Sequence, residues 1–266
     1  MSGARALLTC CAIAIATSLA LARIHPFGDA GLYATRPAKA TILESSSVPP
    51  EVRAILSAKC ADCHSSLTRV PLYGRSAPAS WLMERDIVRG RQAMNFSLWN
   101  SYSAEQQQTL GAKIVQETRE HEMPPLQYRM IHWRSTISDA DSRVLAVWSH
   151  GMPGTSGAES DQSTVAGDPS RGKIIFVKHC TGCHSLTENR EGPKLLGVYE
   201  RASGTVEGYD YSPALKKAHI VWDEESLGKW LTDPDAFIPG NNMDFLVSKP
   251  QERLDLISFL KQGSGK

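Results

Sequence analysis

One short motif constrains this chain of 266 residues more than any other feature, because the pentapeptide Cys-x-x-Cys-His occurs in it twice. The two copies are Cys60-Ala-Asp-Cys63-His64 and Cys180-Thr-Gly-Cys183-His184. This spacing allows two thiols to add to the two vinyl groups of one porphyrin while the adjacent His coordinates the iron, and it is the attachment signal of c-type haem. Two copies, each followed by candidate distal ligands, predict two covalently bound haem c groups.

The other two cysteines, Cys10 and Cys11, lie in an apolar N-terminal stretch. If that stretch is removed or embedded in a membrane, no thiol is left for a structural disulfide or a nucleophile. Zinc is the competing ligand for the two cysteine pairs. It explains less of the pattern, because a His follows each pair directly and a zinc site does not need that repeat. The sequence also contains no Ser-His-Asp order, phosphate-binding loop or metal-binding helix motif.

Residues 1–22 form a predicted signal peptide or membrane anchor. Arg5 precedes the apolar run Ala6–Ala22, which ends in Ala-Leu-Ala, the form of a signal-peptidase cleavage site. The run of 17 residues is also at the lower limit for a helix that spans a membrane. Cleavage and retention as a tether through residues 6–22 both stay open. Either outcome predicts an exported protein, in a bacterial periplasm, as either a soluble or an inner-membrane-anchored form.

The rest of the chain divides into four predicted parts. Residues 23–47 are an extended lead-in, 48–151 an N-terminal haem domain, 152–167 a linker and 168–266 a C-terminal haem domain. The linker is rich in Gly, Ser, Thr and acidic residues, which indicates flexibility. A hydrophobic content of 41% is sufficient for packed cores, and a net charge of +1 gives no reason to expect a nucleic-acid partner.

Both haem domains are predicted to be helical, and strand signals are scarce, so the expected fold class is all-α. Apolar residues at helical spacing run from Pro50 into the first motif. Ser103 with Gln106 forms a capping box, and we expect the helix that starts at Ser80 to end at Gly90. Further helix starts are predicted at Ser138 (boxed with Asp141), Ser170, Asp223 and Pro250.

The C-terminal segment resembles the mitochondrial branch of the class I cytochromes c. The resemblance is carried by GDPSRGKIIFVKHCTGCHS, GPKLLGVYERASGTVEGYDYSPAL, IVWDEESLGKWLTDP, PGNNMDF and ERLDLISFLKQ. It implies that His184 and Met243 are the axial ligands of the haem bound by Cys180 and Cys183. A thioether opposite an imidazole gives a higher potential than two histidines. The resemblance also implies that the carbonyl of Pro193 accepts a hydrogen bond from the other ring nitrogen of His184.

Two departures from that family stand out. Trp230 replaces a tyrosine that usually lies close to the ligand sulfur, which should alter the potential. Asn242 and Asp244 flank Met243 where the mitochondrial proteins have a Lys before it and no acid after it, so their lysine-rich docking ring is thinned. Other residues match the family by position: Arg201, Tyr211 and Trp222 at the inner propionate, Phe245 beside the exposed haem edge, and Phe176 and Phe259 where the first and last helices cross.

Residues 48–151 resemble a bacterial haem-binding domain family through KCADCHSSLTRVPLYGRSAPASWLMERDIVRGRQAMNFSLW and HEMPPLQYRMIHW. Members are exported and often begin with an apolar anchor. We expect His64 to be the proximal iron ligand and Met123 to be the distal one, because Met123-Pro124-Pro125 has the irregular backbone that can lay a sulfur onto iron. The rival ligands that stay open are Met130, Met94, His121 and His132.

Together these features predict two cytochrome c-like helical domains joined by a flexible linker, in a dihaem cytochrome that transfers single electrons. Its expected partners are redox proteins, either a membrane complex or a soluble donor or acceptor. Two six-coordinate irons leave no position for a substrate, so we do not expect an enzyme. The alternatives are a dihaem peroxidase-like enzyme, with Glu120, Glu122 or His121 as the acid or base, and a sensor that uses the N-terminal haem.

Overall fold

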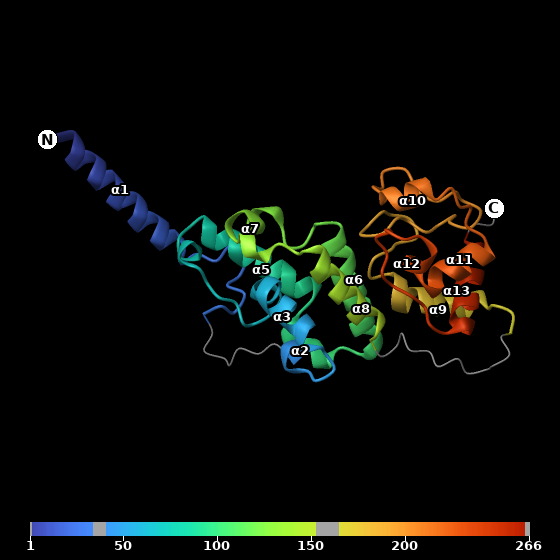
Figure 1. The fold of residues 1–266 in the computed structure, drawn as a ribbon. Coiled ribbons are helices and arrows are strands. Elements are labelled where there is room, and N and C mark those ends of the chain that lie inside the picture. The colour runs from blue at the N-terminus through green and yellow to red at the C-terminus, as the bar shows by residue number, and fades with distance from the viewer. Residues whose placement is uncertain (1, 34–40, 153–164, 264–266) are drawn as a thin grey trace. The chain divides into compact units, whose positions relative to one another are not determined.

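The computed structural model describes residues 2–33, 41–152 and 165–263, and the chain forms two compact units, Met1–Ser101 and Tyr102–Lys266. Helices make up the regular structure of both units (Figure 1). The described residues contain no strand, only an isolated antiparallel bridge between Ala202 and Val221. The predicted all-α class is therefore confirmed.

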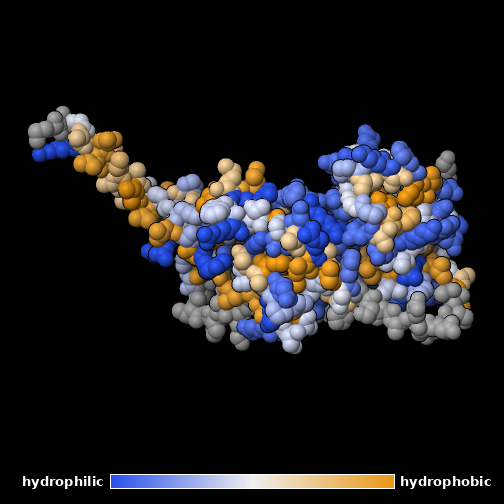
Figure 2. Space-filling view, viewed as in Figure 1, coloured by the Kyte–Doolittle hydropathy of each residue, from blue (hydrophilic) through white to orange (hydrophobic). Residues whose placement is uncertain are grey.

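The first unit begins with a long apolar helix. Figure 2 shows hydrophobic side chains along much of α1, and its Gly3–Leu21 segment is long and apolar enough to cross a membrane. The chain after α1 is held by Trp81, whose Nε1 donates to the Ile24 carbonyl over 2.7 Å. The elements of this unit are α1 (Ser2–Leu21), α2 (Thr41–Glu44), α3 (Pro50–Lys59), α4 (Ala61–His64), η1 (Leu72–Arg75), α5 (Ala79–Ala93) and η2 (Phe96–Ser101).

Helix α3 delivers the first cysteine motif. It starts with Pro50 in its first turn, where the missing N–H of proline costs no hydrogen bond. Val52, Ile55 and Leu56 are buried along one face, as their spacing predicts. The helix ends at Lys59 with Cys60 as its C-cap, and α4 carries the rest of the motif.

The prediction for α5 is wrong at both ends. The helix begins at Ala79, with Ser80 fully buried inside its first turn, and it continues past Gly90 to Ala93. Gly90 lies against the first motif, because a Cβ built there would be 3.1 Å from the carbonyl oxygen of Cys63. This glycine therefore allows α5 to pass close to α4 and does not terminate the helix.

The second unit contains the remaining helices. Both predicted capping boxes are confirmed, Ser103 with Gln106 before α6 and Ser138 with Asp141 before α8. Asp168 caps α9, which starts one residue before the predicted Ser170. The elements are α6 (Ala104–Arg119), α7 (Leu126–Ile131), η3 (Trp133–Ser135), α8 (Asp139–His150), α9 (Pro169–Ile175), the π-helical turn η4 (Phe176–Cys180), α10 (Pro213–Lys217), α11 (Glu224–Thr232), α12 (Pro234–Phe237) and α13 (Pro250–Gln262).

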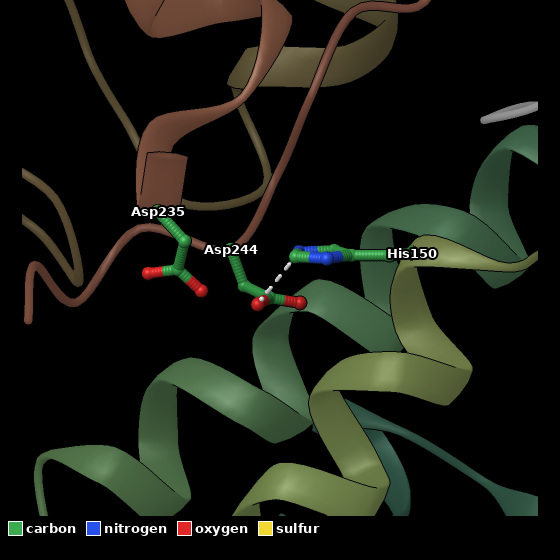
Figure 3. A group of neighbouring side chains, drawn as sticks. All are labelled: His150, Asp235 and Asp244. Carbon is green, nitrogen blue, oxygen red and sulfur yellow. Dashed lines mark ion pairs between the residues drawn. The ribbon is translucent and has the colours of Figure 1, made fainter. Parts of the chain in front are cut away.

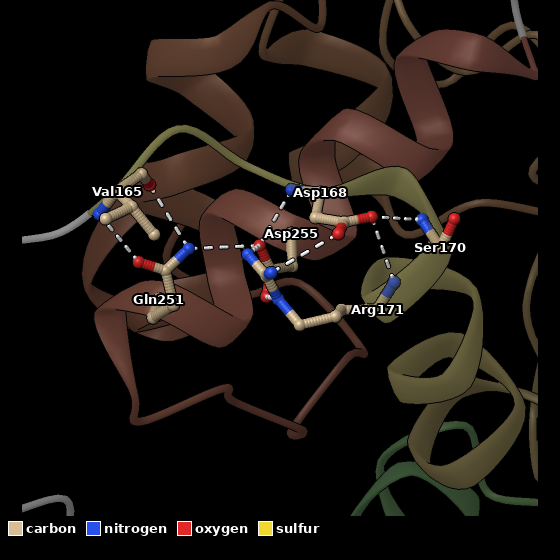
Figure 4. A network of polar contacts seen from close by, with 6 residues as sticks. All are labelled: Val165, Asp168, Ser170, Arg171, Gln251 and Asp255. Atoms are coloured by element: carbon tan, nitrogen blue, oxygen red, sulfur yellow. Dashed lines mark hydrogen bonds and ion pairs between the residues drawn. The ribbon is translucent and has the colours of Figure 1, made fainter.

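Helices α9 and α13 cross in close contact. The rings of Phe176 and Phe259 lie 5.4 Å apart at the crossing. Figure 4 shows the polar network beside it, in which the Arg171 guanidinium donates to both carboxylate oxygens of Asp255 over 2.7 and 2.8 Å. The backbone N–H of Asp168 also donates to Asp255 over 2.8 Å. The Arg171 hydrogen bonds lower the pKa of Asp255 to about 2.

A hydrophobic core of the second unit lies inside its cytochrome-like part. Leu256, Ile257 and Leu260 of α13 are buried in it, as predicted, and the rings of Trp222 and Trp230 lie 5.4 Å apart. Most of the predicted linker, residues 153–164, lies outside the described residues. The second unit begins at Tyr102, which is earlier than the predicted start of the C-terminal domain at residue 168. Helices α6 and α8, predicted to be part of the N-terminal domain, therefore lie in the second unit.

Candidate haem sites

The two cysteine motifs share a pattern of backbone hydrogen bonds. In each copy the second cysteine and the histidine both direct their N–H groups to the carbonyl of the first cysteine. The four hydrogen bonds are Cys63 to Cys60 at 3.2 Å, His64 to Cys60 at 3.1 Å, Cys183 to Cys180 at 3.2 Å and His184 to Cys180 at 2.8 Å. This shared tight turn places two thiols and one imidazole close together in both units.

The second motif opens into a large apolar cavity of about 950 Å³, open solvent at its mouth included. His184 and Met243 both line it, together with Cys180. The apolar part of the wall consists of Leu195, Val198, Leu215, Trp222, Leu227, Trp230, Leu231, Leu256 and Leu260. A flat, largely hydrophobic group with a metal at its centre suits such a lining.

Gly192 forms a cradle for the ring of His184. A Cβ built on Gly192 would collide with that ring, and its three nearest atoms are all imidazole atoms. The next residue, Pro193, presents its carbonyl oxygen 2.8 Å from Nδ1 of His184. The hydrogen bond leaves Nε2 for a metal, and burial lowers the pKa of His184, so the imidazole stays neutral.

The polar part of the cavity wall includes residues that the sequence resemblance places at a propionate. Arg201 lines the cavity and donates to the carbonyl oxygens of Leu196 and Lys194, at 3.1 and 3.0 Å. Tyr211 and Trp222, both 7% exposed, line the same wall. Burial lowers the pKa of Arg201, because the charged guanidinium loses solvation in this wall.

A second cavity of about 470 Å³, open solvent at its mouth included, reaches the two cysteines of this motif. It shares His184 and Met243 with the larger one, and Phe245 forms part of its wall. Burial raises the pKa of Cys180 to about 12 and that of Cys183 to about 11, so both are neutral thiols. The thiols, imidazole, thioether and apolar walls therefore fit a haem c that is bound through both cysteines.

The first motif has a comparable histidine environment. Nδ1 of His64 lies 3.1 Å from the carbonyl oxygen of Met94, and the ring of Phe96 lies 5.6 Å from the imidazole. Burial lowers the pKa of His64 and raises that of Cys63 to about 11. The donor set therefore fits a second haem c. Met94, one of the rival distal ligands, contacts His64 through its carbonyl oxygen and is itself buried.

The predicted distal ligand of this first site lies in the second unit. Met123 follows α6, donates its backbone N–H to the Glu117 carbonyl over 3.1 Å and is 37% exposed. Of its rivals, Met130 is 77% exposed and His132 stacks on Tyr128 with ring centroids 4.1 Å apart. Ligation by Met123 stays a prediction, because His64 belongs to the other unit.

Three contributing residues were missed from the sequence. Gly90 gave a usable signal, since a glycine within a helical pattern often marks a close approach of two backbones. The carbonyl of Met94 has no signal, because any residue could supply it. Tyr209 lines the larger cavity and donates its hydroxyl to the Glu191 carbonyl over 2.6 Å, a contact that only tertiary structure reveals.

Comparisons with known proteins match two families to this chain. Residues 25–151 match the family described as Haem-binding domain, and residues 169–264 match the family described as Cytochrome c. Cytochrome c of Euglena viridis is 47% identical over 98 residues, which cover 36% of this chain and 96% of that protein. Cytochrome c of Chlamydomonas reinhardtii is 43% identical over 103 residues, 37% of this chain and 92% of that protein.

Among solved structures, cytochrome cH from Methylobacterium extorquens matches at 39% identity and a TM-score of 0.35, with 36% of this chain and 99% of that chain covered. Each of the two matched families covers one of the two cysteine motifs. The chain binds two haem c groups and belongs to the cytochrome c family.

Proposed function

We propose that this protein is an exported dihaem cytochrome c that carries single electrons between redox partner proteins. One observation carries the proposal: His184 and Met243 line one apolar cavity together with Cys180. Haem iron bound there supplies one-electron oxidation and reduction. A cytochrome c-type site of this kind implies electron transfer. Its partners are therefore other redox proteins.

The chain's own residues determine how each site holds its group. In the second site Pro193 orients His184 through a 2.8 Å hydrogen bond, and Arg201, Tyr211 and Trp222 form the wall for a propionate. In the first site the Met94 carbonyl orients His64 over 3.1 Å, and Met123 is the proposed distal ligand. Ligation by Met243 and Met123 would leave both irons six-coordinate.

The N-terminal helix supports export. From Gly3 to Leu21 the residues of α1 are exposed except the half-buried Ser18, and this segment is apolar enough to cross a membrane. A signal peptide and an anchor share these properties. We propose a periplasmic location for the haem-bearing part, where a membrane complex or a soluble protein would donate and accept the electrons.

An optically monitored redox titration of the purified holoprotein tests the proposal, with carbon monoxide added to the fully reduced form. Two high-potential transitions and no spectral change with carbon monoxide are expected. Met243→Ala and Met123→Ala should each create one iron that binds carbon monoxide and lower one potential. Met130→Ala is the matched control, because this exposed methionine follows Met123 by seven residues.

Carbon monoxide binding to the unaltered protein would contradict the pure-carrier function. In that case the open iron would make the peroxidase-like or sensing function the better one. If Met130→Ala and not Met123→Ala opened the first site, the distal ligand would be Met130.

A further inference from the structure

Helix α6 carries one face that packs against the cytochrome c part of the second unit. Thr109, Ala112 and Gln116 recur at spacings of three and four residues, so they lie on the same side of the helix. All three line the 470 Å³ cavity that also contains Cys180 and Cys183. Helix α6 therefore forms a wall over the cysteine-bearing edge of this haem site.

Buried amides on the same face make specific contacts. Gln108 and Gln116 are 4% and 8% exposed. Nε2 of Gln108 donates to the Leu246 carbonyl over 3.1 Å, and Nε2 of Gln116 donates to the Glu191 carbonyl over 2.7 Å. Because a buried polar group without a partner is costly, these contacts fix the position of α6 on the cytochrome c part.

Three ion pairs border this face. Glu105 pairs with Lys178 at 2.9 Å, and Lys113 pairs with Glu191 at 2.5 Å. Arg119, at the end of α6, pairs with Asp235 at 2.8 Å. In each of these three pairs, a charge on α6 meets an opposite charge on the cytochrome c part, so the pairs favour this position of α6.

The pKa values of the central pair agree with its geometry. Burial lowers the pKa of Lys113, but the hydrogen bond and charge of Glu191 outweigh it, and the net shift is upward. For Glu191, burial raises the pKa, while the Lys113 contact lowers it to a net downward shift. Both shifts favour the charged forms.

Helix α8 adds a further contact beside the Met243 ligand. Figure 3 shows His150 of α8 directed at Asp244, and Nε2 of His150 lies 3.0 Å from Oδ1 of that carboxylate. Asp235 lies next to them, and the group could resemble a metal site. The guanidinium of Arg119, however, lies 2.8 Å from Asp235 and 3.4 Å from Asp244 and already supplies the positive charge. The cluster is therefore an ion-pair network.

We propose that α6, supported by α8, is a built-in docking partner that covers the cysteine-bearing edge of the second haem site. The inference rests on the proposed electron-transfer function. The partner surface that faces this edge belongs to the chain itself, so an external redox protein reaches it only after α6 leaves. The ion pairs make this release sensitive to charge and to ionic strength.

Zero-length carbodiimide cross-linking of the holoprotein at low salt tests the contact directly. The expected products, identified by mass spectrometry, join Lys113 to Glu191 and Glu105 to Lys178. The double variant Lys113→Glu/Glu105→Lys reverses two charges on α6, leaves the net charge unchanged and should abolish both products. Adding Glu191→Lys and Lys178→Glu restores opposite charges and should restore both products, which also shows that the variants fold.

Reduction by a small blue-copper protein, followed by stopped-flow absorbance, tests the covering role. The double variant should react about tenfold faster than the unaltered protein in the phase assigned to the second haem, the order of change expected when an association barrier is removed. The rate with ascorbate, which needs no docking surface, should change far less. Lys229→Glu is the matched control, because Lys229 pairs with Glu225 on the exposed side of α11.

Each outcome decides the inference. Absence of both cross-links in the unaltered protein would overturn it, even if the redox titration still showed two carrier haems. Cross-links together with an unchanged blue-copper rate in the double variant would also overturn it, because α6 would then not cover the edge. Failure of the proposed function would appear in the carbon monoxide test and would leave the cross-links intact.

Discussion

Replacing Gly192 by Ala would place a methyl group against the ring of His184. A Cβ built at Gly192 lies 2.5 Å from Nδ1 and 2.7 Å from Nε2 of that ring. Attractive contacts between heavy atoms need about 3.5–4.0 Å, so the imidazole would have to retreat by roughly 1 Å. The retreat would also disturb the 2.8 Å hydrogen bond from Nδ1 to the Pro193 carbonyl.

Forcing an extra methyl group into a packed site costs about 1–3 kcal/mol, which is roughly a 5- to 150-fold change in the unfolding equilibrium. Gly192→Ala should therefore lower the guanidinium midpoint of the holoprotein. Displacement of His184 should also weaken its bond to the iron, so reduced Gly192→Ala should bind carbon monoxide, whereas we expect no binding to the unaltered protein. Denaturation followed at the haem absorbance and a carbon monoxide titration measure the two effects.

Gly228→Ala is the control for this prediction. Gly228 lies inside α11, and a Cβ there would meet no atom within 4 Å. Its replacement should stabilise the protein by about 0.4–1 kcal/mol, because alanine has less freedom to lose on folding. If Gly192→Ala unfolded at the same midpoint as the unaltered protein and bound no carbon monoxide, the inferred packing of the backbone on His184 would be refuted.

Three further predictions concern the fold. Ser138→Ala removes the capping box of α8 and should cost about 1 kcal/mol in urea denaturation, and an unchanged midpoint would contradict the role of the cap. Leu256→Ala leaves a cavity where a side chain only 1% exposed was packed, and it should lower the free energy of unfolding by about 2–5 kcal/mol, measured as a fall in the thermal midpoint. Hydrogen bonds from Arg171 lower the pKa of Asp255 to about 2, so the carboxylate stabilises the fold above its unfolded pKa of about 3.9, and this contribution is lost as the pH falls toward 2. Asp255→Asn should lose less stability than the unaltered protein across that pH range. If the free energy of unfolding fell equally with pH in both proteins, the reasoning would be wrong.

The features that could be predicted from the sequence depend on residues close together in the chain. The capping boxes of α6 and α8 each pair residues three positions apart, and both are present. The apolar face of α3 follows from helical spacing alone, and its three residues are buried. The cysteine motifs belong to the same class, because all their ligand-bearing atoms lie within five consecutive residues.

Features that depend on distant segments were beyond such reasoning. Gly90 predicted a helix end, yet its role is to let α5 approach Cys63 of another helix. Gln108 and Gln116 would be expected at the surface of an isolated helix, and they are buried because their acceptors lie at Leu246 and Glu191. No local pattern encodes contacts across 75 to 138 positions of the chain.

The π-helical turn η4 sets the rotational phase of the second cysteine motif. Phe176 at its start faces Phe259 of α13, while Cys180 at its end lines the cavity. Because successive residues of an α-helix are rotated by about 100°, removing one residue between them would turn Cys180 away by roughly that angle unless the turn were rebuilt. The wider π-helical turn therefore lets Phe176 pack against α13 while Cys180 faces the cavity. A regular α-helix of the same length would orient these two side chains differently relative to each other.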